Sequence, residues 1–421
     1  MILLTTRSKH IYDPFTSVRL RIAPYAKQFS LPVTTLFVSL LFNCDLPYSP
    51  EPQTHTAESK NISIESGTVY AVNGSKQICN PSISHGGEYN GCMLWLNFGG
   101  VLNVRVPDGM DYKTDRTSVR QHDRLTISDT SNTVRWFMMN SSLGISGQLQ
   151  DPEWSTHNDY IIALGDEKND YRWDSYAIRL SDRKHIKLSQ DNLIETATPH
   201  LWVVPDANPE NESFSAGYSN DRGGFADRHS VRSFFGTDSV KVVYTLKKNG
   251  HTLFYIDYSS NRPEPVQLKK PNNRNDWNTE SPLISPDGNW IAFNCTNQGV
   301  YESYIQRLDA SSVPILIAEG AVDPHWWIHP EFGSPYIVYC RIKEDYFIKE
   351  DYTDPSIADG SVGSTYKQEI LTASGNLPAH ASYSPRGEPS LLVNLPFKGG
   401  LSDNGRYVCT GYGGGFILSL F

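Results

Sequence analysis

Histidine and glutamate occupy matching positions in several distant parts of this sequence. Glu153, His200 and His325 each follow a proline that leads into an apolar stretch, and His380 lies in a further stretch of the same kind. Imidazole and carboxylate groups gathered around one opening can bind a metal ion, an anion or the carboxylate of a peptide. The alternative interpretation is that these side chains face only trapped water.

These residues come together only if the segments that carry them are strands with a common orientation. Successive side chains of a strand point to opposite faces, so the residue after each leading proline should face the same way in every segment. Ser82 and Leu283 hold the corresponding position in two other segments. We therefore predict that the glutamate and the histidines named above form one ligand-binding site.

Two tryptophans are candidates for ligand recognition. Trp326 lies in "DPHWWIHPEF", beside a second tryptophan and two histidines. An aromatic face next to hydrogen-bonding groups suits a sugar ring or a peptide segment. Packing between neighbouring repeats is the alternative for this stretch, since one of the two adjacent rings must point that way. Trp277, in the polar stretch "NRNDWNTE", is the better candidate for an exposed recognition aromatic.

The sequence contains none of the common catalytic motifs. It has no G-x-S-x-G elbow, P-loop, dinucleotide-binding fingerprint or H-E-x-x-H. A glycosidase needs two carboxylates facing across a cleft, but nothing in the sequence selects a pair. The acidic cluster Asp166, Glu167, Asp170 and Asp174 matches no EF-hand loop, so a solvated hairpin is preferred over a calcium site. We assign no catalytic residue, metal ligand or cofactor.

The segments that carry the candidate residues resemble one another. In "SPLISPDGNWIAFNC", Ser281–Cys295, two apolar runs flank a turn built on Pro286, Asp287 and Gly288. A similar unit occurs in "GLSDNGRYVCTGY" near the end of the chain. The shared unit is a short strand led by proline, a turn and a second strand. Looser relatives begin at Pro81, Pro152, Pro199 and Pro324, and another contains His380.

The leading prolines are spaced as the blades of a β-propeller require. Pro152 and Pro199 are 47 residues apart, and Pro282 and Pro324 are 42 apart. A four-stranded blade takes roughly 40 to 50 residues. The 83 residues from Pro199 to Pro282 correspond to two blades. The 71 residues from Pro81 to Pro152 correspond to one blade with an insertion, or to a blade and a weak additional one.

Two further segments fit this architecture. The runs "VKVVYTL" and "HTLFYIDY", joined through Asn249-Gly250, predict a hairpin within the longest interval. The last stretch, "GGGFILSLF", is predicted to be a strand that closes the ring by pairing with an early strand. Because one repeat cannot bury its own faces, each blade needs the next one beside it.

The repeat resembles that of the TolB-like β-propellers. In that family an Asp-Gly turn joins the first two strands of a blade, and Asp287-Gly288 and Asn404-Gly405 match this turn. The corresponding turns at 85–87, 156–158 and 385–387 depart from it. The resemblance implies that residues 66–421 form an all-β propeller of six or seven four-stranded blades, whose first strands line a central channel. It also implies partners such as envelope proteins or cell-wall components.

The first 65 residues differ in composition from the rest. Five basic residues precede the uncharged run "SLPVTTLFVSLLFNC", Ser30–Cys44. Its apolar part is too short to span a bilayer but fits the apolar core of a secretory signal. We predict an export segment over 1–44 and a flexible Pro-rich linker over 45–65. Cys44 ends the run as the lipid-modified cysteine of a bacterial lipoprotein would, and a plain secreted protein is the alternative.

The other five cysteines show no C-x-x-C spacing. Cys295, Cys340 and Cys409 each close an apolar strand, which predicts buried thiols. Cys79 and Cys92 are candidates for a disulfide in an oxidising compartment.

Composition and charge narrow the class of partner. Aromatic residues make up 12% of the chain and charged residues 20%, with 31 glycines and 26 prolines, which suits many short strands and turns. The formal net charge of -9 and the lack of a basic stripe exclude nucleic acid as a partner.

We therefore predict a monomeric, non-catalytic binding or scaffolding module of the cell envelope, periplasmic or at the cell surface. Lipid on Cys44 would anchor it to the membrane. Its expected partner is an envelope protein or a cell-wall glycan, recognised through the channel mouth and the surrounding loops. The main alternative is a carbohydrate-active propeller enzyme or a glycan-binding protein.

Overall fold

The computed structural model divides the chain into two compact units, Met1–Thr54 and His55–Phe421, and every residue it describes belongs to the second. The predicted export segment (1–44), with Cys44, and the predicted linker (45–65) lie outside the described residues. Within the described part, no helix is both long and apolar enough to cross a membrane. The described residues are 68–76, 78–189, 196–204, 218–219, 224–246, 252–271, 278–297, 300–319, 321–328, 330, 335–341, 379–383, 390–393, 400–410 and 415–419.

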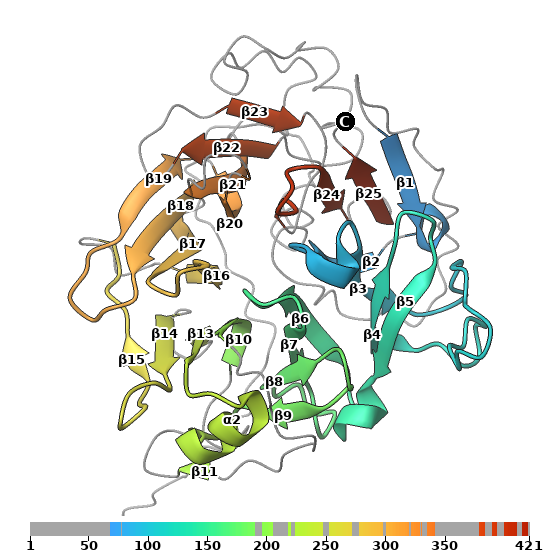
Figure 1. The fold of residues 1–421 in the computed structure, drawn as a ribbon, viewed down its shortest axis with the longest axis horizontal. Coiled ribbons are helices and arrows are strands. Elements are labelled where there is room, and N and C mark those ends of the chain that lie inside the picture. Colours follow the sequence, from blue (N-terminus) through green and yellow to red (C-terminus); the bar gives the residue numbers. More distant parts are fainter. Residues whose placement is uncertain are drawn as a thin grey trace, which may run out of the picture. The chain divides into compact units, whose positions relative to one another are not determined.

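Five four-stranded antiparallel sheets follow one another along the chain, here called blades 1 to 5 (Figure 1). Blade 1 contains β2 (Ile78–Ile83), β3 (Met93–Phe98), β4 (Gln121–Ser128) and β5 (Val134–Met139). Blade 2 contains β6 (Leu149–Trp154), β7 (Tyr160–Gly165), β8 (Asp174–Arg179) and β9 (His185–Lys187). Blade 3 contains β10 (Thr196–Val203), β13 (Val240–Leu246), β14 (Thr252–Asp257) and β15 (Val266–Gln267).

The last two blades complete this series. Blade 4 contains β16 (Asn278–Ile284), β17 (Trp290–Asn297), β18 (Val300–Arg307) and β19 (Ile315–Glu319). Blade 5 contains β20 (Ala321–Ile328), β21 (Pro335–Arg341), β22 (Ala379–Tyr383) and β23 (Ser390–Val393). The first strands of successive blades contact one another and face a common centre in Figure 1.

A three-stranded closing sheet joins the two ends of this series. It contains β24 (Tyr407–Thr410), β25 (Gly415–Ser419) and β1 (Thr68–Val72), in the order β1-β25-β24. The early strand β1 pairs antiparallel with β25, the last strand described, so the predicted ring closure is confirmed. Contacts between β24 and β2 connect the closing sheet to blade 1.

The predicted blade count is corrected by this topology. The described residues form five four-stranded blades and the closing sheet, rather than six or seven four-stranded blades. The interval from Pro199 to Pro282 holds one blade with a long insertion, because β10 pairs directly with the predicted hairpin β13–β14. The 71-residue interval also holds a single blade, with its insertion between β3 and β4, as one of the two interpretations expected.

The insertion in blade 3 contains β11 (Tyr218–Ser219), β12 (Phe225–Ala226) and the short helix α2 (Arg228–Phe235). The Asp227 side chain caps this helix by accepting a hydrogen bond from Ser230 N (2.8 Å), and Gly236 ends it in the left-handed conformation. The apolar face of α2 packs into the core between blades 2 and 3. Capping residues and an apolar face therefore explain why this stretch is helical in an otherwise all-β unit.

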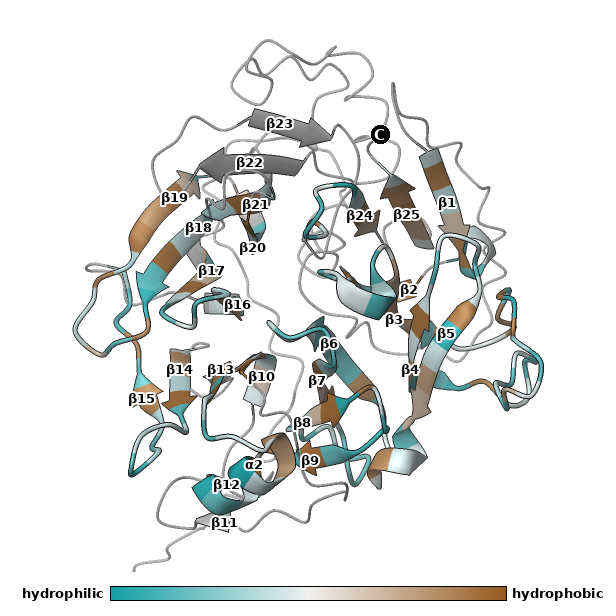
Figure 2. Ribbon diagram, in the orientation of Figure 1, coloured by the Kyte–Doolittle hydropathy of each residue, from teal (hydrophilic) through white to brown (hydrophobic). Residues whose placement is uncertain are grey.

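The hydrophobic core lies between the faces of neighbouring sheets. Figure 2 shows hydrophobic residues concentrated in the strands and hydrophilic residues in many of the connecting turns. Separate apolar clusters fill the spaces between blades 2 and 3, blades 3 and 4, blades 4 and 5, and the closing sheet and blade 1. Full burial of one aliphatic or Phe side chain contributes about 1.5 to 3 kcal/mol. Each blade therefore depends on its neighbours, as the repeat predicted.

The cysteines follow the expectation only in part. Cys295 and Cys409 are buried in these clusters, as predicted, and the side chain of Cys340 lies outside the described part. Cys92 is a buried free thiol, so the suggested Cys79–Cys92 disulfide is wrong. Cys79 forms a disulfide with a different cysteine.

Candidate functional site at the channel mouth

A serine-based turn ends the first strand of blade 4 and recurs in the closing sheet. Ser285 N donates to Trp290 O (2.8 Å), Gly288 N donates to Ser285 O (2.8 Å), and Trp290 N donates to Ser285 Oγ (3.0 Å). The closing sheet repeats this pattern, with Ser402 bonded to Tyr407 in the same way. The predicted Asp-Gly and Asn-Gly turns are therefore confirmed. They place the residue after each serine at one end of the channel.

A bulge interrupts the first strand of every four-stranded blade at its proline. The residue before the proline has a positive φ, between 42° and 56°, and the pairing register shifts there. Proline cannot donate a ladder hydrogen bond, which accounts for a bulge at this position. The prolines therefore lie within the strands rather than at their starts. The residues that precede them are Asn80, Asp151, Thr198, Ser281 and Asp323.

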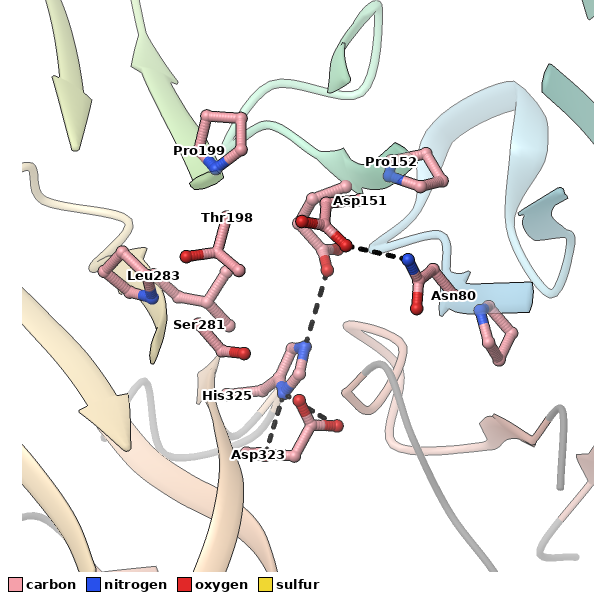
Figure 3. Close-up of a pocket in the computed structure, with 12 residues that line it drawn as sticks. Asn80, Asp151, Pro152, Thr198, Pro199, Ser281, Leu283, Asp323 and His325 are labelled. Atoms are coloured by element: carbon pink, nitrogen blue, oxygen red, sulfur yellow. Dashed lines mark hydrogen bonds and ion pairs between the residues drawn. The ribbon is translucent and has the colours of Figure 1, made fainter. Parts of the chain in front are cut away.

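These bulges direct a ring of small polar side chains toward the axis. Figure 3 shows Thr198, Ser281, Asp323, Asp151 and Asn80 around a narrow space of about 50 Å³. Asn80 Nδ2 donates to Asp151 Oδ1 (2.8 Å), which links the neighbouring blades 1 and 2 beside the axis. The narrow part of the channel is therefore polar and holds little more than a few water-sized groups.

The channel widens at one end into a cavity of about 400 Å³, here called the mouth. Its walls differ in chemical character from one side to the other. Blades 4 and 5 contribute the mainly apolar wall, and blades 1, 2 and 3 with the closing sheet contribute mainly polar residues. The apolar wall consists of Leu283, Ile284, Pro286, Trp326, Trp327, Ile328 and Pro330. The remaining lining residues are His85, Glu153, Thr156, Asn158, His200, His325 and Asp403.

Glu153 is held at the base of the mouth by two donors. Its Oε1 accepts hydrogen bonds from the Ser82 hydroxyl and from Trp154 N (3.0 Å). Its Oε2 faces His325 Nε2 at 3.8 Å. Burial favours the neutral acid, but the imidazole of His325 and the Ser82 hydroxyl outweigh it and lower the pKa of the Glu153 carboxyl. Glu153 is therefore ionised at neutral pH.

His325 is buried between two acidic side chains, with 4% of its surface exposed. Its Nδ1 contacts Asp323 O at 3.0 Å and Asp323 Oδ2 at 3.9 Å. Burial disfavours the charged ring, yet the charge of Asp323 and the facing Glu153 outweigh it and raise the pKa of His325 to about 9. A positively charged imidazolium therefore faces the Glu153 carboxylate at neutral pH.

His200 lies in the same cavity but in a different state. Its Nδ1 accepts a hydrogen bond from Ile284 N (3.0 Å), so this ring connects blade 3 to blade 4. Burial lowers the pKa of His200 to about 3, although Glu153 acts in the opposite direction. His200 is therefore a neutral ring with a fixed acceptor nitrogen, and its role in packing the blades is evident from this bond.

The outer edge of the mouth contains a second histidine and carboxylate. His85 Nδ1 and Asp403 Oδ1 are 3.8 Å apart, and Asp403 N donates to His85 O (2.7 Å). Burial lowers the pKa of His85. Sequence reasoning missed both residues. Their position directly after Ser84 and Ser402, the serines that end their strands, was the signal that could have identified them.

The two adjacent tryptophans bind neighbouring sheets through their indole N–H groups. Trp326 Nε1 donates to Leu283 O (3.0 Å), and Trp327 Nε1 donates to Ser402 O (3.0 Å). Their exposed fractions are 7% and 8%. Both rings pack between sheets, the alternative named above, and both also border the mouth. Recognition of a ligand by Trp326 stays a prediction.

The structure brings three of the predicted residues together and separates a fourth. Glu153, His200 and His325 line the same cavity. His380 lies in β22, the third strand of blade 5, where it pairs with Tyr339 rather than beginning a blade. Its predicted place on a first strand is therefore wrong, because the repeat that contains it is the outer hairpin of blade 5. The predicted Trp277 lies outside the described residues.

The geometry of the acidic and histidine groups does not suggest a metal centre. In the described part of the chain, no group of three or more His, Cys, Asp or Glu side chains is arranged to hold a metal ion. In the acidic cluster of blade 2, Lys187 Nζ forms ion pairs with Glu167 and with Asp174 Oδ2 (2.7 Å). Asp166 accepts hydrogen bonds from two backbone N–H groups of the following loop. Lys187 therefore pairs with two of the four carboxylates, and backbone N–H groups bind a third.

Comparison with known proteins gives distant structural similarity only. No protein-family model matches the chain, and no curated protein matches it. It is similar to Kuenenia stuttgartiensis hydrazine synthase, with 11% identity, a TM-score of 0.40, and coverage of 68% of this chain and 38% of that one. It is also similar to the Swd1 β-propeller domain of Myceliophteria thermophila, with 10% identity, a TM-score of 0.40, and coverage of 85% and 99%. An oligogalacturonate lyase in complex with manganese matches with 8% identity, a TM-score of 0.38, and coverage of 84% and 90%.

The topology itself defines the class of protein. The described unit is all-β apart from α2 and short 3-10 turns, with a propeller-like arrangement of five four-stranded blades and a closing sheet. Folds of this kind serve many functions, so the activity has to be argued from the mouth.

Proposed function

We propose that this protein is an exported binding or scaffolding module of the cell envelope, with a propeller of the TolB-like type, that holds a protein or cell-wall ligand at its channel mouth. The observation that carries the proposal is the mouth cavity of about 400 Å³, with a buried charged pair, Glu153 and His325, at its base. Its volume lies within the roughly 300 to 1,000 Å³ typical of ligand sites.

The polar groups of the mouth are positioned before any ligand arrives. Glu153 is fixed by Ser82 and Trp154, and His325 is fixed by Asp323. Groups that are already ordered lose little conformational entropy when a ligand binds, which favours affinity. The rigid blades around them support the same conclusion, since every first strand is anchored in a sheet.

A comparison of captured envelope components tests the proposal. The full chain is immobilised and exposed to solubilised envelope, beside Glu153→Gln and the control Lys113→Ala, which changes an exposed loop residue. We expect the wild type and the control to retain the same component and the Glu153 variant, shown to be folded by cooperative unfolding, to lose it. Equal retention by all three would place the binding surface elsewhere, and retention by none would refute a binding module.

The export component of the proposal rests on the pattern of residues 1–44. The intact mass of the protein purified from its native envelope tests this component. We expect a chain that starts near Cys44, with the added mass of lipid if that cysteine is the anchor. A mature chain that begins at Met1 would refute export through this segment.

A carbohydrate-active enzyme is the second candidate function. Two carboxylates, Glu153 and Asp403, line the mouth, and a glycosidase needs two such groups. Release of reducing ends from a panel of polysaccharides, lost in Glu153→Gln, would support this candidate. Binding without turnover would leave the binding module as the function.

A further inference from the structure

The base of the mouth contains a donor and an acceptor that do not reach each other. His325 Nε2 and Glu153 Oε2 are 3.8 Å apart, beyond hydrogen-bond distance. His325 Nε2 is buried and has no hydrogen-bond partner among the described residues. A buried polar atom without a partner calls for an explanation, and one explanation is a ligand group that fills the gap. The same side chain borders the mouth.

The chemistry of the two atoms restricts what can fill this gap. The protonated His325 ring offers N–H and needs an acceptor, whereas the ionised Glu153 carboxylate needs a donor. An ammonium group has no lone pair to accept from His325. A carboxylate has no proton for Glu153 and would be repelled by it. The N–H and C=O of one trans peptide group point in opposite directions, so a peptide backbone cannot serve both atoms with one unit.

A hydroxyl group meets both requirements with a single atom. Its oxygen accepts from His325 and its proton is donated to Glu153. Hydrogen bonds with one charged partner are shorter and stronger than neutral ones, so such a hydroxyl would be held tightly. A neutral group also suits this position, because it leaves the buried charged pair in balance.

The walls of the mouth suit a whole sugar ring and not only one hydroxyl group. The apolar wall comes from blades 4 and 5, including Leu283, Ile284 and Trp326. The polar groups His85, Asn158 and Asp403 stand on blades 1 and 2 and the closing sheet. A pyranose ring has a matching division, with C–H groups on its faces and hydroxyls around its edge. A protein that holds such a ring commonly places apolar surface against the faces and polar groups at the edge.

We infer that the mouth binds a neutral sugar unit of a glycan, with one ring hydroxyl between His325 Nε2 and Glu153 Oε2. This inference rests on the proposed function and specifies its ligand class. The sugar lies against the wall formed by blades 4 and 5. Its remaining hydroxyls face the edge formed by His85, Asn158 and Asp403.

Titration of the full-length protein with simple sugars tests the inference. The neutral probes are glucose, galactose and N-acetylglucosamine, and the charged counterparts are glucosamine and glucuronic acid. Calorimetry or ligand-observed NMR at pH 7 should show at least one neutral sugar bound about tenfold or more tightly than either charged counterpart, because a charged sugar would add an unbalanced charge to a mouth whose buried charged pair is already balanced. Tighter binding of a charged counterpart would overturn the inference.

Monodeoxy analogues of the best neutral sugar identify the bridging hydroxyl. Removal of one particular hydroxyl should weaken binding about tenfold or more in the wild type and less than about threefold in Glu153→Gln, since the variant has already lost the ionic acceptor. Lys113→Ala is the matched control, and removal of the same hydroxyl should weaken its sugar binding as much as it does in the wild type. If Glu153→Gln does not fold, the deoxy series on the wild type still decides, because equal losses at every position would exclude one privileged hydroxyl.

The outcomes also separate this inference from the proposed function. Absence of sugar binding, together with an envelope protein retained through the mouth, would overturn the sugar inference and leave the binding module intact. Sugar binding that is unchanged in Glu153→Gln would place the sugar at another surface and overturn the assigned site. If the wild type neither binds a sugar nor retains an envelope component, both proposals are refuted.

Discussion

Replacing His325 by glutamine should remove a contribution to stability that depends strongly on pH. In the folded protein the pKa of His325 is raised to about 9, from 6.5 for a free histidine. A group whose folded pKa is raised stabilises the protein fully below its unfolded pKa, and this stabilisation is lost as the pH rises through its folded pKa. For His325 the window therefore extends from about pH 6.5 to about pH 9.

The magnitude follows from the difference between the two pKa values. One pKa unit corresponds to about 1.4 kcal/mol at 25 °C, so the shift of His325 corresponds to about 3 kcal/mol. No large reduction for solvent screening is needed, since only 5% of the His325 side chain is exposed. The groups that face this ring are Glu153 on β6, Asp323 on β20, and the neutral rings of His85 and His200.

Urea unfolding of the wild type and of His325→Gln from pH 6 to pH 9.5 measures this effect. The difference in free energy of unfolding between them should shrink by about 3 kcal/mol over that range. Taking the difference removes the contribution of groups that titrate alike in both proteins. His229→Gln, which removes an exposed histidine of α2, should follow the wild type throughout. A difference that stays constant with pH would refute the charged state assigned to His325.

Three further predictions concern the packing of the blades. Gly288→Ala should lower the free energy of unfolding by about 2 kcal/mol or more, because φ is +71° and the new Cβ would lie 2.5 Å from the Trp202 ring. Gly100 has a similar φ of +78° but open space around it, so Gly100→Ala should lower that free energy by only about 1 kcal/mol, through backbone strain alone. Equal losses of unfolding free energy in urea would contradict the steric part. Trp327→Phe removes the indole hydrogen bond to the closing sheet and should lower the free energy of unfolding by about 1 kcal/mol or more. Amide hydrogen exchange in β25 should become faster, and unchanged exchange would argue against this contact. Burial raises the pKa of the Cys92 thiol to about 12, so iodoacetamide at pH 8 should label it only after unfolding, and rapid labelling of the native protein would contradict its burial.

The repeated parts of the fold could be predicted because their signals are local. A turn such as Ser285-Pro286-Asp287-Gly288 is specified by four adjacent residues, and the structure contains it with the expected hydrogen bonds. That Glu153, His200 and His325 point the same way could also be predicted from the prolines before them. The bulge at each proline fixes the direction of the next side chain.

The errors came from features that depend on pairing between distant strands. An interval of suitable length was interpreted as two blades, although β10 pairs with β13 across an insertion that includes α2. The stretch with His380 has the appearance of a first strand, but β22 pairs with β21 and lies away from the axis. Sequence spacing alone does not distinguish an inner hairpin from an outer one.

The polar residues at the outer edge of the mouth were not predicted, for a related reason. Asp403 and His85 belong to turns that come together only because the closing sheet stands beside blade 1. The partners of the charged pair also lie on different blades, so the raised pKa of His325 follows from the closed ring and not from its own sequence context.

The closing sheet also has a consequence for the order in which the protein can be completed. Thr68 pairs with Ser419, so the two strands are separated by about 350 residues of intervening chain, a very non-local contact. During synthesis, β1 has no partner until the ribosome has released β25, and the faces of the first and fifth blades stay uncovered until then. This delay makes the unfinished chain prone to association with other chains.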